Sequence, residues 1–364
     1  MLLDILIPTY KRPHRVLETI KTLLSAGDKR FRIICSSNCY ENDLEILRKI
    51  DARVSYNYFE DNIGPVGNIK ELLLASTSKY AMYLSDEDTL DLASFILFLD
   101  HLETLDENQS VILCSVFNAS TERFFYKIPL FLEGHSLDLG TALTLHIFPH
   151  YLSGYVFKRQ LIEDKDIENH YSNSRGGVYP MLYLGLELLK KGELGFFSKK
   201  MVLLGSAQVI KDDNFYGDIN PLKEDSHSEK SNSINYYNPY IYSASAFVRQ
   251  FYFAEKQLVN LKPFISQVDY FYASINRFLH MYISIALADK VFRNTKHSIS
   301  RDCEIAFQEA LKDREVSGSI YSKLFRKTFK FPVSIGYYLA KMISISIKIS
   351  KYMLVVWRLL SKKY

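Results

Sequence analysis

The first 84 residues alternate between short apolar runs and segments with helical spacing, and this alternation restricts the fold more than any other feature of the chain. The apolar runs lie at residues 2–7, 31–35, 54–59 and 80–84. Between them, apolar residues recur with the 3.6-residue period of helices at about 16–24, 44–50 and 66–75. Strands that alternate with helices form parallel βαβ units, and such sheets bind ligands beyond the carboxyl ends of their strands. We therefore predict an α/β fold with its site at that edge.

The rest of the chain is organised differently. We predict further strands at 111–116, 151–157 and 201–204, and a helix at 179–189. Residues 211–235 are rich in Asp, Asn, Ser, Lys and Glu and have little periodicity, which predicts a mobile loop or linker. From residue 236 onward the pattern is helical. We therefore divide the chain into a first domain over 1–210, a linker over 211–235 and a helical region over 236–364.

The C-terminal segment has an unusual charge. Residues 316–364 contain ten Lys and Arg and no Asp or Glu, although the whole chain carries a net charge of only +4. Read as a helix, the segment has a narrow polar stripe and a broad apolar face that includes Trp357, which is typical of helices lying in a membrane interface. A helix packed on the first domain with a solvated basic edge is the alternative, and the alternation of Ile and Ser at 343–350 would also suit a strand. We predict a membrane-associating tail; nucleic-acid binding is not expected.

Export and membrane spanning are not expected either. The N-terminus has no basic region before its apolar run, and Asp4 interrupts that run. No stretch offers the roughly 20 apolar residues of a spanning helix. The four cysteines lack CxxC spacing, as expected for reduced thiols. These features predict a cytoplasmic protein that is peripheral on the inner face of the membrane.

An acidic triplet, Asp86-Glu87-Asp88, follows the fourth predicted strand directly. Its two aspartates are suited to holding a divalent cation, and such a cation neutralises the charge that develops on a diphosphate leaving group. Acidic triplets are common on protein surfaces, so this one carries weight only through its place at a strand end.

Two further motifs also occupy strand ends. They are Ile-Leu-Ile-Pro-Thr-Tyr-Lys-Arg-Pro at 5–13 and Asn-Ile-Gly-Pro-Val-Gly-Asn at 62–68. With the triplet, they give the first 205 residues or so a resemblance to family 2 glycosyltransferases, and more narrowly to the abequosyltransferase-like group that builds bacterial surface polysaccharides. The resemblance implies a GT-A fold, which is a Rossmann-like, mostly parallel sheet flanked by helices.

The resemblance also implies roles for individual residues. Asp86 would approach the ribose and, with Asp88, form the site of Mn²⁺ or Mg²⁺, and Ser153-Gly154 would lie beside the sugars. The nucleotide-sugar donor would further contact Pro8, Thr9, Tyr10, Arg12, Asn68 and Glu87. Members of the family carry an acidic residue after the second strand, where this chain has Ser37 and Asn38. Either of these two could bind the base instead, or Glu41 and Asp43 could reach in.

The general base is the least defined part of the site. An inverting transfer needs a group that takes the proton from the acceptor hydroxyl. The family places an acidic residue at about 175–181, and this chain has none there. The candidates are Asp166, Glu168 and His170, with Asp164 and Asp213 as further possibilities.

Together these features predict a metal-dependent inverting glycosyltransferase. Its acceptor would be a lipid-linked or oligosaccharide chain of a surface glycan such as O-antigen or capsule. A nucleotidylyltransferase is disfavoured because Pro8-Thr9-Tyr10-Lys11 is not a glycine-rich phosphate loop. The alternative is a non-catalytic membrane-associated scaffold with a degenerate transferase domain. The sugar, the linkage and the oligomeric state are not determined by the sequence.

Overall fold

The structure of the chain is a computed structural model that describes residues 1–129, 132–145, 151–172, 180–205, 258–276, 278–279, 308, 312, 349–350 and 353–354. The predicted linker at 211–235 and nearly all of the predicted tail at 316–364 lie outside these residues. The chain divides into two compact units. The first comprises Met1–Asp138, Pro149–Arg175 and Tyr179–Ser226, and the second comprises Leu139–Phe148, Gly176–Val178 and His227–Tyr364.

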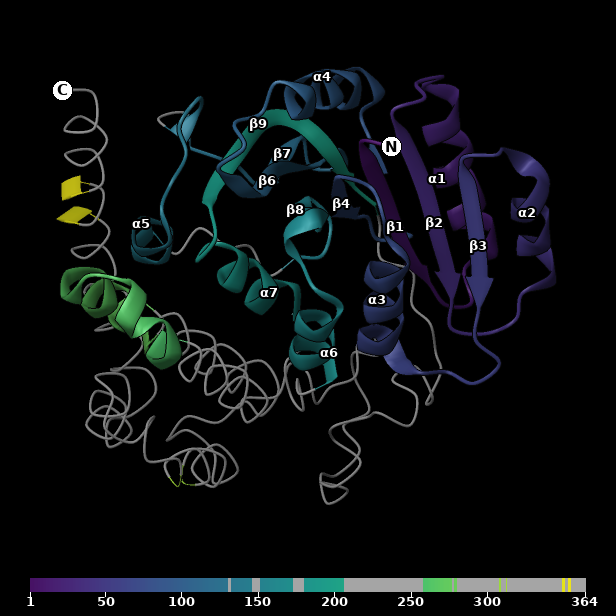
Figure 1. Cartoon of the computed structure of the whole chain (residues 1–364). Coiled ribbons are helices and arrows are strands. Elements are labelled where there is room, and N and C mark those ends of the chain that lie inside the picture. Colours follow the sequence, from purple (N-terminus) through teal and green to yellow (C-terminus); the bar gives the residue numbers. More distant parts are fainter. Residues whose placement is uncertain are drawn as a thin grey trace, which may run out of the picture. The chain divides into compact units, whose positions relative to one another are not determined.

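A nine-stranded sheet forms the centre of the first unit (Figure 1). Its order is β3-β2-β1-β4-β8-β6-β9-β5, and β7 pairs with β6 outside this path. The strands are β1 (Leu3–Thr9), β2 (Phe31–Ser37), β3 (Val54–Tyr58), β4 (Tyr80–Tyr83), β5 (Thr89–Leu90), β6 (Gln109–Asn118), β7 (Arg123–Tyr126), β8 (Tyr155–Lys158) and β9 (Glu193–Leu204). Strands β3, β2, β1 and β4 are mutually parallel, and antiparallel β8 joins them to β6.

Helices cover this sheet because its strands are apolar on both faces. Helices α1 and α3 both contact β1, whose residues are almost all buried, and α4 contacts β9. Proline lies in the first turn of α1 and of α3, where the missing N–H costs nothing. The helices of the first unit are α1 (Pro13–Ser25), α2 (Leu47–Ile50), α3 (Gly64–Ala75), α4 (Leu92–Glu103), α6 (Asp164–Ser172) and α7 (Pro180–Leu188).

The strand order reverses between β1 and β4, and we call the region beyond the carboxyl ends of these two strands the crevice. From β1 the chain moves outward through β2 to β3, and it then returns to the other side of β1 to form β4. Open α/β sheets bind ligands at such a reversal of strand order, beyond the carboxyl ends of the two strands. The motif at 5–13 lies at the end of β1, and the acidic triplet follows β4. The topology therefore brings together segments that are about 75 residues apart.

The amino end of β1 is fixed by a buried carboxylate. Asp4 is fully buried and accepts two hydrogen bonds of 2.9 Å from Arg32. It also accepts hydrogen bonds from the backbone of Thr77 and from the backbone and hydroxyl of Ser78. Burial acts to raise the pKa of Asp4, but these hydrogen bonds outweigh it and lower the pKa. This network joins β1, β2 and the turn before β4 at the end of the sheet opposite to the crevice.

The predicted α/β fold is confirmed, with local differences. The strand predicted at 201–204 begins at Glu193, and the strand predicted at 151–157 begins at Tyr155 because Gly154 adopts φ +92°, which ends extended pairing before it. The sequence patterns missed α4, α6 and the β6–β7 hairpin. Helix α4 is apolar on most sides, which hides its period.

The second unit contains α5 (Leu139–Leu145) and a short 3₁₀ helix at Lys262–Phe264. Within it the buried carboxylate of Asp269 accepts a 2.7 Å hydrogen bond from Thr144, and the amide of Asn276 donates to the Thr144 carbonyl. Among the described residues, no helix is long and apolar enough to cross a membrane.

Candidate active site

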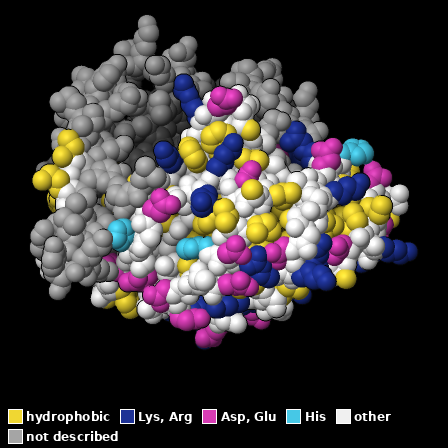
Figure 2. All heavy atoms as spheres, turned by 90° about the horizontal axis from the view of Figure 1, so that it is seen from above, with side chains coloured by type: hydrophobic (Ala, Val, Ile, Leu, Met, Phe, Trp, Pro, Cys, Tyr) yellow, Lys and Arg dark blue, Asp and Glu magenta, His cyan; other side chains and the backbone are white. Residues whose placement is uncertain are grey.

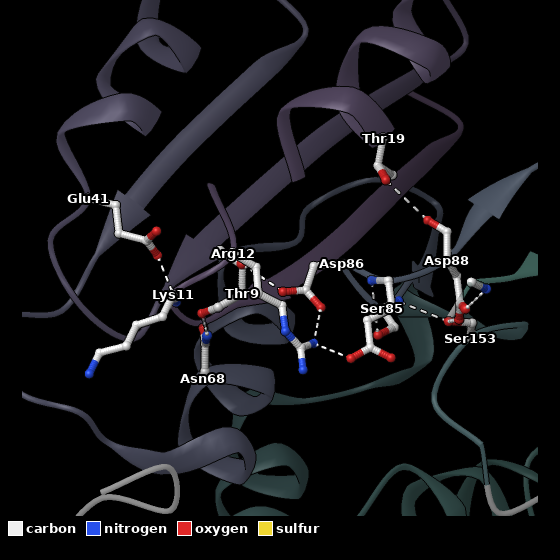
Figure 3. A network of polar contacts seen from close by, with 12 residues as sticks. Thr9, Lys11, Arg12, Thr19, Glu41, Asn68, Ser85, Asp86, Asp88 and Ser153 are labelled. Carbon is white, nitrogen blue, oxygen red and sulfur yellow. Dashed lines mark hydrogen bonds and ion pairs between the residues drawn. The ribbon is translucent and has the colours of Figure 1, made fainter. Parts of the chain in front are cut away.

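The carboxylate of Asp86 lies at the crevice between β1 and β4 and is 4% exposed. Thr9, the last residue of β1, donates a 2.8 Å hydrogen bond to Asp86 Oδ2. Arg12, just before α1, donates a 2.9 Å bond to Asp86 Oδ1 and forms an ion pair with Glu87 (Figure 3). The motifs that end β1 and β4 therefore meet through one carboxylate.

Asp88 is held more completely than Asp86. Its carboxylate accepts hydrogen bonds from the hydroxyl of Tyr151 at 2.7 and 2.9 Å, from Ser153 Oγ at 2.5 Å and from the backbone N–H of Gly205 at 3.0 Å. Ser153 Oγ in turn accepts a 2.8 Å bond from the Ser85 N–H, so it links the two sides of the turn after β4. Asp88 is only 1% exposed. Two separate segments, residues 151–153 and Gly205, thus fix one carboxylate.

Burial disfavours the ionised form of both aspartates. It raises the pKa of Asp86, and the charge of Arg12 and the hydrogen bond from Thr9 oppose this rise. Burial also raises the pKa of Asp88, against the hydrogen bonds from Ser153 and Tyr151, and the negative charge of Asp86 adds to the rise. A positive charge brought by a ligand would stabilise both groups in their ionised form.

The residues present fit a divalent cation that is shared with a ligand. Among the described residues, no group of three or more His, Cys, Asp or Glu side chains is arranged to hold a metal by itself. Mg²⁺ is usually bound by one or two carboxylates together with the phosphates of a substrate. Asp86 and Asp88 are the two buried carboxylates that could supply the protein's share of such a site.

Buried polar atoms without partners lie next to the crevice, where β1 and β2 end. The amide nitrogen of Asn68 donates to the carbonyls of Thr9 and Ser36, and the backbone N–H of Asn38 donates to Thr9. Within the described part of the chain, the side-chain oxygens of Asn38 and Asn68 and the hydroxyl of Ser36 are buried and make no hydrogen bond. Buried polar groups are normally paired, so these atoms are suited to binding a polar ligand.

A carboxylate also lies at the end of β2, although no acidic residue directly follows that strand in the sequence. Glu41 Oε1 accepts a 2.9 Å hydrogen bond from Ser37 Oγ and a 3.0 Å bond from the Lys11 N–H (Figure 3). The turn through Lys11, whose φ is +54°, brings its backbone to this carboxylate. Of the two acidic residues considered from the sequence, Glu41 reaches the strand end, whereas Asp43 is exposed in the following 3₁₀ turn.

The other predicted donor residues lie around the same crevice. Pro8 is within β1, and Tyr10 is buried just after it. Ser153 and Gly154 occupy the turn before β8. A Cβ atom on Gly154 would lie 3.3 Å from the Cys114 carbonyl, so the backbone at this point is tightly packed.

Among the described residues, Asp164, Asp166 and Glu168 have no hydrogen bond or ion pair with this network. Asp166 and Glu168 lie on α6, where Asp166 pairs with Lys191 and Glu168 pairs with Lys70. Asp164, at the start of the same helix, pairs with Arg159. The side chain of His170 and all of Asp213 lie outside the described residues. The role of these residues as a base stays a prediction.

Two residues that hold Asp88 were missed by the sequence analysis. Tyr151 precedes the Ser153-Gly154 pair by two residues, and Gly205 follows β9 directly. A Cβ atom on Gly205 would lie 1.6 Å from the carbonyl oxygen of Glu87, so only glycine fits there. A glycine at a strand end was the available signal for this close approach.

Comparison with known proteins agrees with this geometry. Residues 4–167, which include most of the site, match the family model described as Glycosyl transferase family 2. No curated protein sequence matches the chain.

Solved structures of S. aureus TarS share the fold. A structure of its residues 1–349 has a TM-score of 0.55 at 10% identity, with 97% of this chain and 92% of that chain covered. A second structure of that fragment, in complex with UDP-GlcNAc, has a TM-score of 0.53 at 12% identity, with the same coverage of 97% and 92%. A longer TarS structure has a TM-score of 0.55 at 11% identity, with 96% of this chain and 54% of that chain covered. The matched domain and the GT-A-like fold together support a glycosyltransferase.

Proposed function

We propose that the chain is a metal-dependent inverting glycosyltransferase that transfers a sugar from a nucleotide-sugar donor to a lipid-linked bacterial surface glycan. The observation that carries the proposal is the meeting of Thr9, Arg12 and two buried aspartates at the reversal of strand order. This is the place where an α/β sheet binds a nucleotide. We include in this proposal that the chain belongs to the abequosyltransferase-like group of these enzymes.

The base and ribose of the donor would bind at the ends of β1 and β2. The unpaired oxygens of Asn38 and Asn68 can accept hydrogen bonds from such a ligand, and Glu41 supplies the carboxylate there. Because the TarS fragment is known in complex with UDP-GlcNAc, UDP and UDP-GlcNAc are the first ligands to test.

The diphosphate would bind between Arg12 and Asp88. Asp88, with Asp86 beside it, would hold Mn²⁺ or Mg²⁺, and the cation supplies charge neutralisation of the leaving nucleoside diphosphate. Arg12 adds a second positive charge, and its side chain is only 12% exposed, which strengthens its interaction with phosphate. Tyr151 and Ser153 would hold Asp88 in one orientation while the bond to the sugar breaks.

Nucleotide binding tests the proposal directly. We expect UDP or UDP-GlcNAc with Mn²⁺ to raise the melting temperature of the full chain, and we expect Asp88→Asn to remove most of that increase. Asp100→Asn is a matched control, because the Asp100 side chain is exposed on α4 and pairs with Arg30. If a panel of nucleotides and nucleotide sugars produced no stabilisation, the scaffold would be the better explanation. Full transfer activity in the presence of a chelator would remove the metal from the proposal.

Membrane association depends on the basic tail at 316–364. A negatively charged membrane surface attracts each nearby Lys or Arg by about 1 kcal/mol. We therefore expect a full-length variant with Lys341, Lys348 and Lys351 changed to Gln to float less with anionic liposomes than the parent protein. Equal flotation of the two proteins would contradict the role of these charges. On the face of the described residues drawn in Figure 2, acidic and basic side chains are interspersed rather than gathered by sign.

A further inference from the structure

An exposed aromatic side chain packs against Tyr151, the residue whose hydroxyl holds Asp88. Phe125, on β7, is 58% exposed, and its ring centroid is 5.1 Å from that of Tyr151 with the planes tilted by 58°. The other two aromatic residues of β7 are half-buried: Phe124 packs edge-on against Phe117 of β6, and Tyr126 packs on the core. Strand alternation therefore turns Phe125 outward while its neighbours fasten the hairpin to the sheet.

Tyr151 connects this exposed ring to the site. Its ring contacts Phe125, and its hydroxyl donates to the carboxylate of Asp88 at 2.7 Å. Phe125 is therefore only one side chain away from the carboxylate to which the cation and diphosphate are assigned. Arg123 is also exposed and lies two residues before Phe125, so both side chains leave the same face of β7.

The chemistry of this surface suits a sugar ring. An exposed phenyl face offers apolar contact to the C–H face of a sugar, and neighbouring polar groups can bind the hydroxyls at the ring edge. A fixed aromatic pair loses little conformational freedom when it binds, because its rings are already held in place. A surface phenylalanine is ordinary by itself; contact with a residue that holds Asp88 makes this one different.

We propose that Phe125 and Tyr151 form a seat for a sugar ring of the acceptor, with Arg123 at its edge. The seat rests on the proposed function, because glycosyl transfer requires a second sugar, that of the acceptor, to be held beside the sugar of the donor. Phe125 supplies the stacking surface. Tyr151 fixes that surface relative to Asp88, and is a positioning residue for the donor side of the reaction.

Saturation-transfer NMR tests the seat without needing turnover. The probes are millimolar methyl glycosides of glucose, galactose, rhamnose and N-acetylglucosamine, added to the full chain with UDP and Mn²⁺. We expect saturation of the ring protons of at least one sugar, and a reduction of about five-fold in Phe125→Ala, the value of one lost aromatic contact. Phe125→Trp should retain the signal. Phe264→Ala is the matched control, since Phe264 is 59% exposed in the second unit.

Two results would overturn the seat: no saturation of any of the four sugars by the parent protein, or equal saturation in the parent and Phe125→Ala. Hydrolysis of UDP-GlcNAc by the same proteins separates this outcome from failure of the proposed function. If the parent hydrolyses the donor while its saturation signal equals that of Phe125→Ala, the seat is wrong and the proposed function stands. Absence of both nucleotide binding and donor hydrolysis in the parent would instead contradict the proposed function.

Discussion

Replacement of Ser153 by Ala tests whether the hydrogen bonds around Asp88 serve the reaction. The variant loses a 2.5 Å hydrogen bond to a buried carboxylate, and a bond to a charged group is worth about 1.5–3 kcal/mol. It also leaves the N–H of Ser85 without the acceptor that it has at 2.8 Å, at a cost of about 1–3 kcal/mol if water does not replace it. Since Tyr151 and Gly205 still hold Asp88, we expect a combined loss of about 3 kcal/mol, divided between stability and catalysis.

Two measurements separate these shares. Urea unfolding gives the loss of stability, and kcat/KM for donor hydrolysis gives the loss of transition-state stabilisation, which we expect to be about 10- to 100-fold. Ser110→Ala is the control, because Ser110 is equally buried and its hydroxyl donates a 3.0 Å bond to the Leu188 carbonyl, away from the aspartates. It should lose about 1 kcal/mol of stability and no activity. If both variants kept full kcat/KM, Ser153 would have only a structural role and our reasoning about Asp88 would be wrong.

Three other predictions concern stability and binding. Asp4→Asn should lower the free energy of unfolding by about 3 kcal/mol at pH 7, because it leaves Arg32 without its buried charged partner. The pKa of Asp4 in the folded protein lies below its usual value, so the stability that its charge contributes is present above about pH 4 and is lost as the pH falls through the folded pKa. Equal urea midpoints for the parent and the variant at pH 7 would contradict this prediction. Gly205→Ala should weaken nucleotide binding at least ten-fold in a calorimetric titration, because the new methyl group would lie 1.6 Å from the Glu87 carbonyl oxygen. Gly185→Ala is the control and should bind the nucleotide normally, because the nearest atom to its new methyl group would be 3.7 Å away. Burial raises the pKa of Asp86 and of Asp88, so affinity for UDP and Mn²⁺ should fall on acidification at a pH above 3.8. Affinity that is constant from pH 7 to pH 4 would refute this.

The donor site was predicted from the positions of the sequence motifs relative to the ends of the strands. The endings of β1 and β4 were predicted to within one or two residues, because short buried strands between amphipathic helices have a clear pattern. The extents of β6 and β9 were predicted only in part, because neither the β6–β7 hairpin nor the start of β9 at Glu193 shows a distinct periodic pattern in the sequence. Gly205, which follows β9 directly, was therefore among the residues that were missed.

By itself, the sequence determined the α/β fold, the strand ends and the presence of an acidic pair at one of them, because these features depend on local spacing along the chain. Only the tertiary structure decided which distant groups reach that pair. Tyr151 and Gly205 contact Asp88 across 63 and 117 residues of sequence, and Glu41 reaches the end of β2 through a turn rather than from the strand itself. Such contacts are fixed by strand order and turn geometry, and these depend on how the whole sheet packs rather than on neighbours in the chain.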